Sequence, residues 1–410
     1  MSREALRRLL GLLSLGPAVV VSVAYTDPGN FGTNIAAGST YGLRLLWVVW
    51  ASGAMAILFQ YLSGKTGLAG VTLTDYVFSR LSRLPGSKVW RLLYFLSLFV
   101  MVLATDMAEF LGIAVGVHLL FHVPLELAVW LSVFDVLILM FLADRSASLE
   151  MVIGSLVAVV ALSYLYEMRI VGVSIGEVIA SSFRVSLGGR GEVLLASSII
   201  GATIMPHAVL LHSYLARDKW GVSRDPVRVR EALRKHAVET VFYLLIASMI
   251  NVSLQVVSYY AFYLHGIHGI ESLEEAYKTL TPLFGSTAAL VFGVAILASG
   301  LSSSMVSVIA GVSVLESYRG RRFQEWKVRL TARLINMIPL YLALRAGLST
   351  IGILVYSQAV LSATLPLVLI PLIHATMNRQ VMGVLANRRV TSIVSIVFVT
   401  MIITINILLL

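Results

Sequence analysis

Long apolar stretches, separated by short polar ones, recur from one end of the chain to the other. A helix needs about 20 mostly apolar residues to cross roughly 30 Å of hydrocarbon, because each residue adds only about 1.5 Å. The apolar pattern therefore predicts eleven membrane-spanning helices. We place them at residues 10–38, 42–64, 90–117, 125–143, 150–168, 193–216, 236–263, 282–312, 328–347, 350–375 and 390–410.

Composition supports this interpretation. Apolar residues make up 58% of the 410 residues, charged residues make up only 13%, and the mean hydropathy is +0.89. A soluble domain carries about 25% charged residues, so this chain lacks the charge to cover a water-facing surface. The chain has no cysteine, which excludes disulfides and thiolate metal sites.

The net charge of +10 is explained by where the basic residues lie. If successive loops alternate between the two sides of the membrane, 24 of the 31 Lys and Arg residues fall on the side of the N-terminus and six on the other. Cytoplasmic loops of membrane proteins are enriched in Lys and Arg. We therefore expect a protein of the cell membrane with its N-terminus in the cytoplasm and its C-terminus outside, and no nucleic-acid partner.

Two of the expected spans are interrupted midway by a proline that has an ionisable neighbour. The first span carries Asp27-Pro28 and the sixth carries Pro206-His207. A proline alone commonly kinks a membrane helix. An ionisable side chain at mid-membrane depth costs several kcal/mol, however, and usually marks a binding site or a pathway. The two positions together predict broken helices that build a site.

Each interrupted span begins a run of five, which indicates two structural halves. Transporters built from inverted repeats place their binding site between such broken helices, near the middle of the bilayer. We expect one transmembrane transporter domain over residues 1–410. Its first repeat covers about 10–168, its second about 193–375, and an extra helix follows at about 390–410.

The backbone at the two breaks predicts ligands for a divalent cation. Proline lacks an N–H, so Pro28 frees the carbonyl of Ala24 and Pro206 frees that of Ala202. Carbonyl, carboxylate and amide oxygens are hard ligands that any divalent cation accepts. The freed carbonyls alone would therefore not select among cations.

Three side chains add to these carbonyls. Asp27 offers a carboxylate, Asn30 an amide oxygen and Met205 a thioether. A thioether binds Mg²⁺ and Ca²⁺ poorly but suits the softer Mn²⁺, Fe²⁺ and Cd²⁺. A buried methionine is more often a packing residue, and the chain has fourteen. The position of Met205 directly before a helix-breaking proline favours a ligand.

At these motifs the sequence resembles the Nramp family of proton-coupled metal transporters. The resemblance extends over essentially the whole chain and rests most on the two breaks. The segments that carry it are Gly16-Pro17, Asp27-Pro28-Gly29-Asn30, Ala104–Phe110, Met205-Pro206-His207, Leu211-His212-Ser213, Leu273–Tyr277, Ser357-Gln358 and Asn406. It implies an all-α integral membrane protein with a LeuT-like fold, a five-plus-five inverted repeat with an eleventh helix, in which helices 1 and 6 are broken.

The resemblance also implies the transported ion and its ligands. The ion is Mn²⁺ or Fe²⁺, with Cd²⁺ as a surrogate, and no resident cofactor is expected. The implied metal ligands are Asp27, Asn30, Met205 and the carbonyl of Ala202, joined in some states by the carbonyl of Ala24 and by Gln358.

A proton route is expected beside the metal site. Asp106 and Glu109 lie three residues apart, hence on one helix face. Arg333 falls inside the ninth span, where an unpaired charge is very costly, so it needs an acidic partner, for which Asp106 is the candidate. The resemblance implies that these acids and this arginine form the proton exit network, and that Asp27 can itself accept the proton.

Two histidines lie on the helix after the second break. His207 adjoins the metal motif and His212 follows five residues later. We count both among the proton-pathway candidates. A buried imidazole is usually a hydrogen-bonded core residue, and for His212 that alternative stays open.

Three positions depart from the family pattern. Phe99 stands where Nramp proteins commonly have a glutamate, seven residues before Asp106, and Leu301 takes the place of a glutamine. Asp135 adds an acid to the fourth span and has no assigned role. These departures leave the metal ligands intact and bear on the proton coupling.

These observations predict a carrier and not an enzyme, since no covalent chemistry is needed. We expect import of divalent metal ions by alternating access, coupled to protons, within the lipid bilayer; the sequence identifies no protein partner. The alternatives are an Nramp-related Mg²⁺ carrier, which would normally lack the methionine, and an uncoupled metal uniporter. An amino-acid transporter of the same fold is disfavoured because Asp27 would repel a substrate carboxylate. A channel or a non-transporting sensor is the last alternative.

Overall fold

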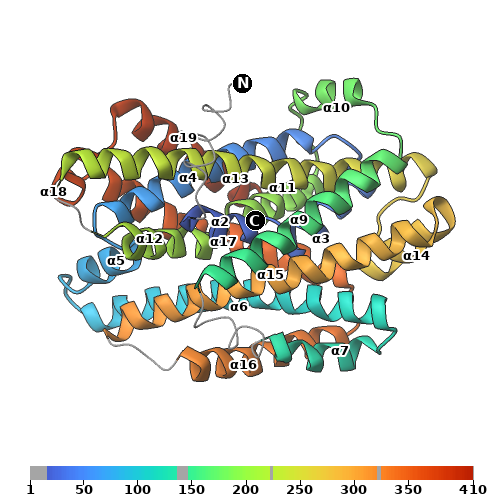
Figure 1. The fold of residues 1–410 in the computed structure, drawn as a ribbon, viewed down its shortest axis with the longest axis horizontal. Helices are drawn as coiled ribbons and strands as arrows, with labels where there is room; N and C mark the ends of the chain where they lie inside the picture. The colour runs from blue at the N-terminus through green and yellow to red at the C-terminus, as the bar shows by residue number, and fades with distance from the viewer. Residues whose placement is uncertain (1–15, 136–145, 222–224, 321–324, 410) are drawn as a thin grey trace.

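The protein is a bundle of helices (Figure 1). The computed structural model describes residues 16–135, 146–221, 225–320 and 325–409. Within these ranges the regular structure is entirely helical. Three parts of the expected spans lie outside the described residues, namely the beginning of the first span (10–15), the second half of the fourth (136–143) and the last residue of the eleventh (410).

The helices follow one another along the chain with short connections. In order they are α2 Pro17–Ala24, α3 Pro28–Tyr41, α4 Leu46–Leu68, α5 Leu73–Leu81, α6 Ser87–Phe121, α7 Leu125–Leu131, η1 Ser132–Phe134, α9 Ser146–Ile170, α10 Ile175–Ser182, α11 Arg190–Ile204, α12 Pro206–Trp220, α13 Pro226–Ala261, η2 Tyr263–His265, α14 Leu273–Phe284, α15 Ser286–Arg319, α16 Glu325–Arg345, α17 Thr350–Met377, α18 Arg379–Met382, η3 Gly383–Leu385 and α19 Arg389–Leu409.

Seven membrane-crossing elements in the described part of the chain are long and apolar enough on their own. They correspond to the expected spans two, three, six, seven, eight, ten and eleven. The segment Ser155–Ile170 of α9, which holds most of the fifth expected span, turns by 113° into α10 and counts as an eighth together with it. The first, fourth and ninth expected spans correspond to α2 with α3, to α7 with η1, and to α16.

The three longest helices exceed the spans predicted for them. α6 has 35 residues, α13 has 36 and α15 has 34. Because about 20 residues already cross the hydrocarbon, these helices continue beyond it. The predicted ranges follow apolarity alone, so they stop where the polar extensions begin.

The broken helices lie in the middle of the bundle. α2, α3, α11 and α12 are buried along most of their length. Longer helices enclose them, with α4 packed on α12 and α13, α17 on α11, and α15 on α6. In Figure 1, α6 and α15 run side by side with α7 and α16 on their outer flank, and α4 and α13 pass on the other side of the centre.

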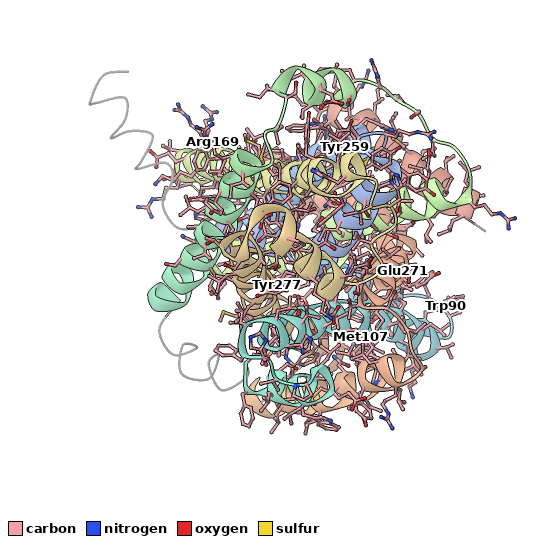
Figure 2. All side chains as sticks on the ribbon, turned by 90° about the vertical axis from the view of Figure 1, so that its right-hand side faces the viewer. Trp90, Met107, Arg169, Tyr259, Glu271 and Tyr277 are labelled. Carbon is pink, nitrogen blue, oxygen red and sulfur yellow. The ribbon has the colours of Figure 1, made fainter. Side chains whose placement is uncertain are left out.

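α10 stands out from the bundle, and the apolar pattern does not predict it. Figure 2 shows it beyond Tyr259 of α13. The hydroxyls of Tyr259 and Tyr260 donate to the two carboxylate oxygens of Glu177 on α10, at 2.8 and 2.5 Å. These two hydrogen bonds tie the short helix to the end of α13.

Candidate metal centre and proton network

The first helix break is capped by its own aspartate. α2 ends at Ala24, α3 begins at Pro28, and Asp27 is the N-cap residue between them. Its carboxylate accepts the backbone N–H of Gly29 at 3.1 Å and that of Asn30 at 2.9 Å. Proline suits the first helical position because the N–H it lacks would be unpaired there. The local sequence thus ends one helix, starts the next, and holds a carboxylate at the break.

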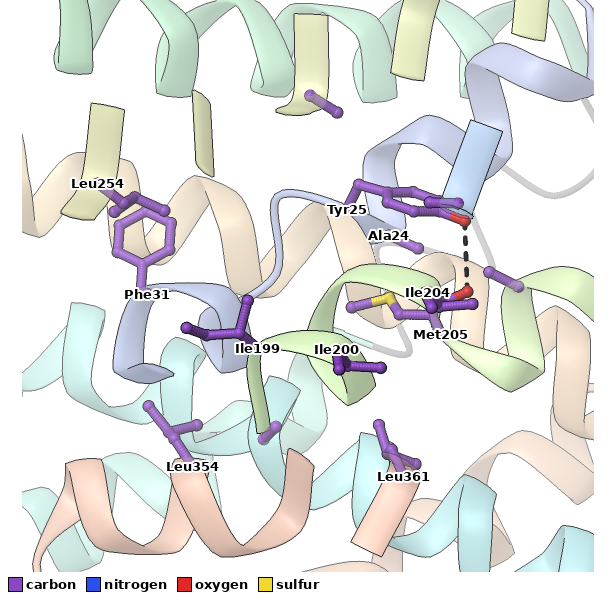
Figure 3. Packing of buried hydrophobic residues seen from close by; sticks show 14 of the residues in the cluster. Ala24, Tyr25, Phe31, Ile199, Ile200, Ile204, Met205, Leu254, Leu354 and Leu361 are labelled. Atoms are coloured by element: carbon purple, nitrogen blue, oxygen red, sulfur yellow. Dashed lines mark hydrogen bonds between the residues drawn. The ribbon is translucent and has the colours of Figure 1, made fainter. Parts of the chain in front are cut away.

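The second break is made by Met205, which stands between α11 and α12. Its φ is +43°, and among the described non-glycine residues only His122 shares a positive φ. Such a backbone costs about 1–3 kcal/mol and is found mostly where function requires it. Pro206 then starts α12. Figure 3 shows Met205 in the buried cluster that also contains Ala24 and Tyr25 of the first break.

The two breaks meet at the side-chain amide of Asn30. Its Nδ2 donates to Asp27 Oδ1 at 2.7 Å, to the Ala202 carbonyl at 3.0 Å and to the Tyr25 carbonyl at 3.2 Å. Three oxygens therefore converge on one buried point, as they would around a cation. The prediction names the carbonyl of Ala24, whereas the carbonyl that reaches Asn30 in this arrangement belongs to the next residue.

Gln358 of α17 lies between the two breaks. A Cβ added at Gly29 would fall well under 3.0 Å from the Gln358 side-chain amide, and one added at Gly201 equally close to the Gln358 backbone oxygen. The side-chain Oε1 of Gln358 is buried and has no hydrogen-bond partner among the described residues. A buried acceptor without a partner is unusual in a folded protein, and it fits a ligand held ready for a cation.

We expect Gly201→Ala to weaken the site while the protein remains folded. The new methyl group would collide with a backbone oxygen, which cannot rotate away as a side chain can, so α11 and α17 must separate. Overpacking of this kind costs about 1–3 kcal/mol. Mn²⁺ affinity measured by calorimetry should fall about tenfold or more. Gly176→Ala in α10, where no atom lies within 4 Å of the added Cβ, is the control. Equal Mn²⁺ affinity in the two variants would contradict this close packing.

A polar chain that sequence reasoning missed leads away from the first break. The Tyr25 hydroxyl donates to the Ile204 carbonyl at 3.4 Å (Figure 3) and accepts from Gln60 Nε2 at 2.8 Å. Gln60 Oε1 lies 2.9 Å from His212 Nδ1. The His212 ring packs edge-on against His236, with centroids 5.0 Å apart. His212 is thus hydrogen-bonded toward α4, and these contacts do not join it to the acids of α6.

His207 connects the second break to α6. It is fully buried, and its Nδ1 lies 3.1 Å from the hydroxyl of Thr105, the residue before Asp106. Its Nε2 has no hydrogen-bond partner among the described residues. Of the two histidines singled out, this one lies beside the acidic network.

The two acids of α6 share one hydroxyl. Ser307 of α15 donates to Asp106 Oδ1 at 2.8 Å, and the same hydroxyl contacts Glu109 Oε2. The other oxygen of Asp106 accepts from the side-chain amide of Asn336 on α16. Ser307 and Asn336 could not be recognised from sequence, because serine and asparagine are common and their roles depend on which helices become neighbours.

Arg333 forms ion pairs with two acids. The predicted partner, Asp106, lies 3.6 Å away, too far for a hydrogen bond, and Asp135, which the sequence left without a role, lies closer, at 2.8 Å. Arg333 also donates to the Ser304 carbonyl at 3.1 Å and stacks over Phe110 at 4.4 Å. Both oxygens of Asp106 already accept hydrogen bonds, one from the hydroxyl of Ser307 on α15 and one from the amide of Asn336 on α16. Arg333 donates a hydrogen bond to Asp135 instead.

The candidate metal centre carries a single formal charge. Among the described residues no group of three or more His, Cys, Asp or Glu could hold a metal ion. The converging ligands are instead one carboxylate, an amide, carbonyls and a thioether. Because affinity for hard cations rises with the number of charged ligands, such a set suits an ion that binds and leaves.

Comparison with known proteins identifies the family. Residues 18–410 match the family described as natural resistance-associated macrophage protein-like, or Nramp. The chain belongs to the Nramp family. The "Divalent metal cation transporter MntH" of Granulibacter bethesdensis is 37% identical over 402 residues, covering 98% of this chain and 88% of that protein. The Yersinia pestis protein of the same name is 36% identical over 407 residues, covering 99% and 96%.

Solved structures of similar proteins confirm the expected Nramp architecture. The manganese transporter of Eremococcus coleocola, in complex with an aromatic bis-isothiourea substituted compound, superposes with a TM-score of 0.87 at 26% identity, covering 99% of this chain and 87% of that one. Mhp1, a nucleobase-cation-symport-1 family transporter, gives a TM-score of 0.61 at 14% identity, covering 97% and 90%. The chain is a multi-pass membrane protein with the all-α, LeuT-like fold. Its Nramp relatives are named as transporters and not as enzymes, as expected for this chain.

Proposed function

We propose that this Nramp protein imports divalent transition-metal ions, Mn²⁺ or Fe²⁺, across the cell membrane by alternating access and together with protons. The observation that carries the proposal is the convergence of oxygens from both broken helices on the Asn30 amide. The substrate class is supported by relatives named as divalent metal cation transporters and by the similar manganese transporter.

The proposed ligand set follows from that geometry. Asp27 supplies the charge, and a rotation of the Asn30 amide by 180° would turn its oxygen toward the point where its nitrogen now meets three acceptors. Met205 supplies the sulfur that favours Mn²⁺, Fe²⁺ and Cd²⁺ over Mg²⁺ and Ca²⁺. The carbonyl of Ala202 completes the set, and the carbonyl of Ala24 and the side chain of Gln358 join it as the helices move.

Alternating access would move the two halves against each other around the breaks. We propose one transporter domain with repeats at about 10–168 and 193–375 and an additional helix at about 390–410. The excess of Lys and Arg on one side favours a cytoplasmic N-terminus and an external C-terminus. Metal would therefore enter from outside, reach the site at mid-membrane and leave into the cytoplasm.

The proposed proton route starts at the metal site. Asp27 must be ionised to bind a cation, so a proton it carries has to leave when the metal arrives. His207, which contacts α6 through a threonine hydroxyl, lies between this site and the acids. Asp106 and Glu109 would receive the proton, and Arg333 would be the cation beside them.

The alternatives make different predictions. A Mg²⁺ carrier has no use for the thioether of Met205, and an amino-acid carrier would have to accept the carboxylate of Asp27 beside that of its substrate. An uncoupled uniporter is distinguished only by proton movement. A channel would not show saturable uptake.

Uptake into liposomes tests the proposal. Purified protein should take up Mn²⁺, Fe²⁺ and Cd²⁺ saturably and leave Mg²⁺ outside, with the four ions compared at two pH values. Mg²⁺ uptake equal to that of Mn²⁺ would contradict the proposed substrate class.

Mn²⁺ uptake should also acidify the liposome lumen, as reported by a trapped pH-sensitive dye. We expect weaker acidification in Asp106→Asn, because this variant removes one protonatable acid from the route. Phe99→Glu should change it little, since the remaining acids already provide the route. Strong Mn²⁺ uptake without acidification under any imposed pH gradient would make the protein a uniporter.

A further inference from the structure

Arg333 contacts two carboxylates unequally. Its side chain is fully buried in α16, where an uncompensated charge is not tolerated. One nitrogen lies 2.8 Å from Asp135, which follows η1, and another lies 3.6 Å from Asp106 of α6. Asp135 also accepts the hydroxyl of Ser304 at 2.7 Å. The ion pair with Asp135 is therefore hydrogen-bonded. The interaction of Arg333 with Asp106 is electrostatic, without a hydrogen bond.

The hydrogen bonds of Ser307 require a proton on the neighbouring acids. A hydroxyl has one hydrogen to donate, yet the Ser307 oxygen faces both Asp106 and Glu109. If the hydroxyl donates to Asp106, Glu109 must be the donor in its own contact with that oxygen, which requires Glu109 to be protonated. Asp106 accepts a second hydrogen bond from Asn336, as suits an anion. The Ser307 hydroxyl also lies 3.2 Å from the Ser304 carbonyl, so the pair of acids carries at least one proton in this arrangement.

The position of Arg333 determines the affinity of the Asp106–Glu109 pair for that proton. A guanidinium paired directly with Asp106 would stabilise both anions and would weaken the hold of the pair on its proton. By binding another nitrogen of Arg333 at the shorter distance, Asp135 neutralises much of this positive charge. The net charge of the Arg333–Asp135 pair, which acts on the two acids of α6, is then close to zero.

The cavity next to Asp106 supplies no such counter-ion. It has a volume of about 120 Å³, and Asp106 and Ser307 are the polar side chains of its lining. Its remaining lining is apolar and includes Phe95, Phe99 and Val102 of α6. Position 99 lies two helical turns before Asp106, and the family pattern places an acid there. In this chain the ring of Phe99 takes that position and lines the apolar part of the cavity.

We propose that Asp135 is the counter-ion that replaces the acid absent at position 99, and that by holding Arg333 it keeps the shared proton on the Asp106–Glu109 pair. The inference rests on the proposed proton coupling. Asp135 is a positioning residue here, since it acts on the acids through the arginine.

The charged and titratable groups around the acid pair come from few elements. In the described part of the chain, α15 presents serines to the pair and no acid or base. The groups that face it from the packed elements are Arg333 of α16, Asp135 after η1, His207 of α12 and Asp27 at the start of α3.

Infrared titration of the purified protein tests this without transport. The carboxylic-acid band that disappears in Glu109→Gln reports the protonated pair. In Asp135→Asn the freed arginine charge should shift the midpoint of this band toward acid by about one pH unit or more. Asp135→Glu, which keeps the charge, should titrate close to the wild type. Glu126→Gln is the matched control, because Glu126 also links α7 to α16 through Arg345, at 3.3 Å, but on the exposed surface.

A double-mutant cycle keeps the test decisive if Asp135→Asn does not fold. Arg333→Gln alone should shift the midpoint toward alkaline pH, because it removes the positive charge that lies beside the acid pair. Arg333→Gln with Asp135→Asn removes the whole ion pair and should return the midpoint close to the wild-type value. A double variant that titrates like Arg333→Gln, or an Asp135→Asn variant that titrates like the Glu126→Gln control, would overturn the proposal.

The two proposals can fail separately. Absence of lumenal acidification in the wild type would refute proton coupling and would leave the infrared result for Asp135 standing. Acidification in the wild type together with an unshifted band in Asp135→Asn would refute only the role of Asp135.

Discussion

Asp27→Ala should abolish Mn²⁺ binding and transport. Among the residues that the structure describes, Asp27 carries the only formal negative charge at the point where the two broken helices meet, and the substitution removes it. Loss of a group that merely supports a metal ligand typically costs 10–100-fold in affinity, so loss of the charged ligand itself should cost about 100-fold or more, equal to about 2.7 kcal/mol. Calorimetry with Mn²⁺ on the purified variant measures this.

The control for Asp27→Ala must separate the metal from the fold. Asp27 also caps α3 through two backbone N–H groups, and loss of a cap costs about 0.5–2 kcal/mol of stability. Ser349→Ala removes the cap of α17, which the Gly352 N–H contacts at 3.1 Å, and leaves the candidate ligands in place. We expect Mn²⁺ binding to survive in Ser349→Ala. Undiminished Mn²⁺ affinity in a folded Asp27→Ala protein would remove Asp27 from the ligand set.

Met205→Ala should change which ions are carried more than how well Mn²⁺ is bound. Without the thioether the remaining ligands are all hard oxygens, which Mg²⁺ and Ca²⁺ accept readily. We expect a modest loss for Mn²⁺, a larger loss for Cd²⁺ and a gain in competition by Mg²⁺. Uptake of each ion into liposomes, alone and against excess Mg²⁺, gives the comparison.

A second buried methionine provides the control for Met205→Ala. Met55 of α4 is 1% exposed, and its truncation leaves a cavity of the same kind at a site away from the breaks. Such a truncation costs about 2–5 kcal/mol of stability but should leave the order of ion preference unchanged. A Met205→Ala protein that carries Cd²⁺ as well as the wild type and still excludes Mg²⁺ would show that sulfur is not the selector.

The helix breaks could be predicted from sequence because their cause is local. Pro28 and Pro206 each remove a backbone donor, and the structure ends α2 and α11 shortly before them. The positive φ of Met205 could not be predicted, since methionine has no preference for that conformation. This backbone conformation depends on how α11 and α12, the two helices that Met205 joins, are placed around the site.

The sequence predicted that Asp106 pairs with Arg333, but the closer partner, Asp135, could not be predicted, because its cause is not local. Apolarity and burial required an acid near this arginine, and both acids fall in neighbouring spans. Which of them lies closer depends on how α6, α15 and α16 pack. The same holds for the contact between Gln60 and His212, which joins α4 to α12 across 152 residues of sequence.

The ends of the longest helices could not be predicted from the sequence either. The range predicted for the third span stops at residue 117, while α6 runs from Ser87 to Phe121. Apolarity reports where a helix leaves the hydrocarbon and carries no information on how far it continues into water. The short helix α10 lies outside any apolar span for the same reason.

X-ray absorption at the cadmium edge tests most directly whether the two breaks together hold the transported metal. The chain has no cysteine, so any sulfur around Cd²⁺ bound to the purified protein must come from a methionine. We expect a shell of oxygens with one sulfur in the wild type. We expect the same shell in Met55→Ala and a shell of oxygens alone in Met205→Ala. An oxygen-only shell in the wild type, or a sulfur that persists in Met205→Ala, would contradict a metal site built by both breaks.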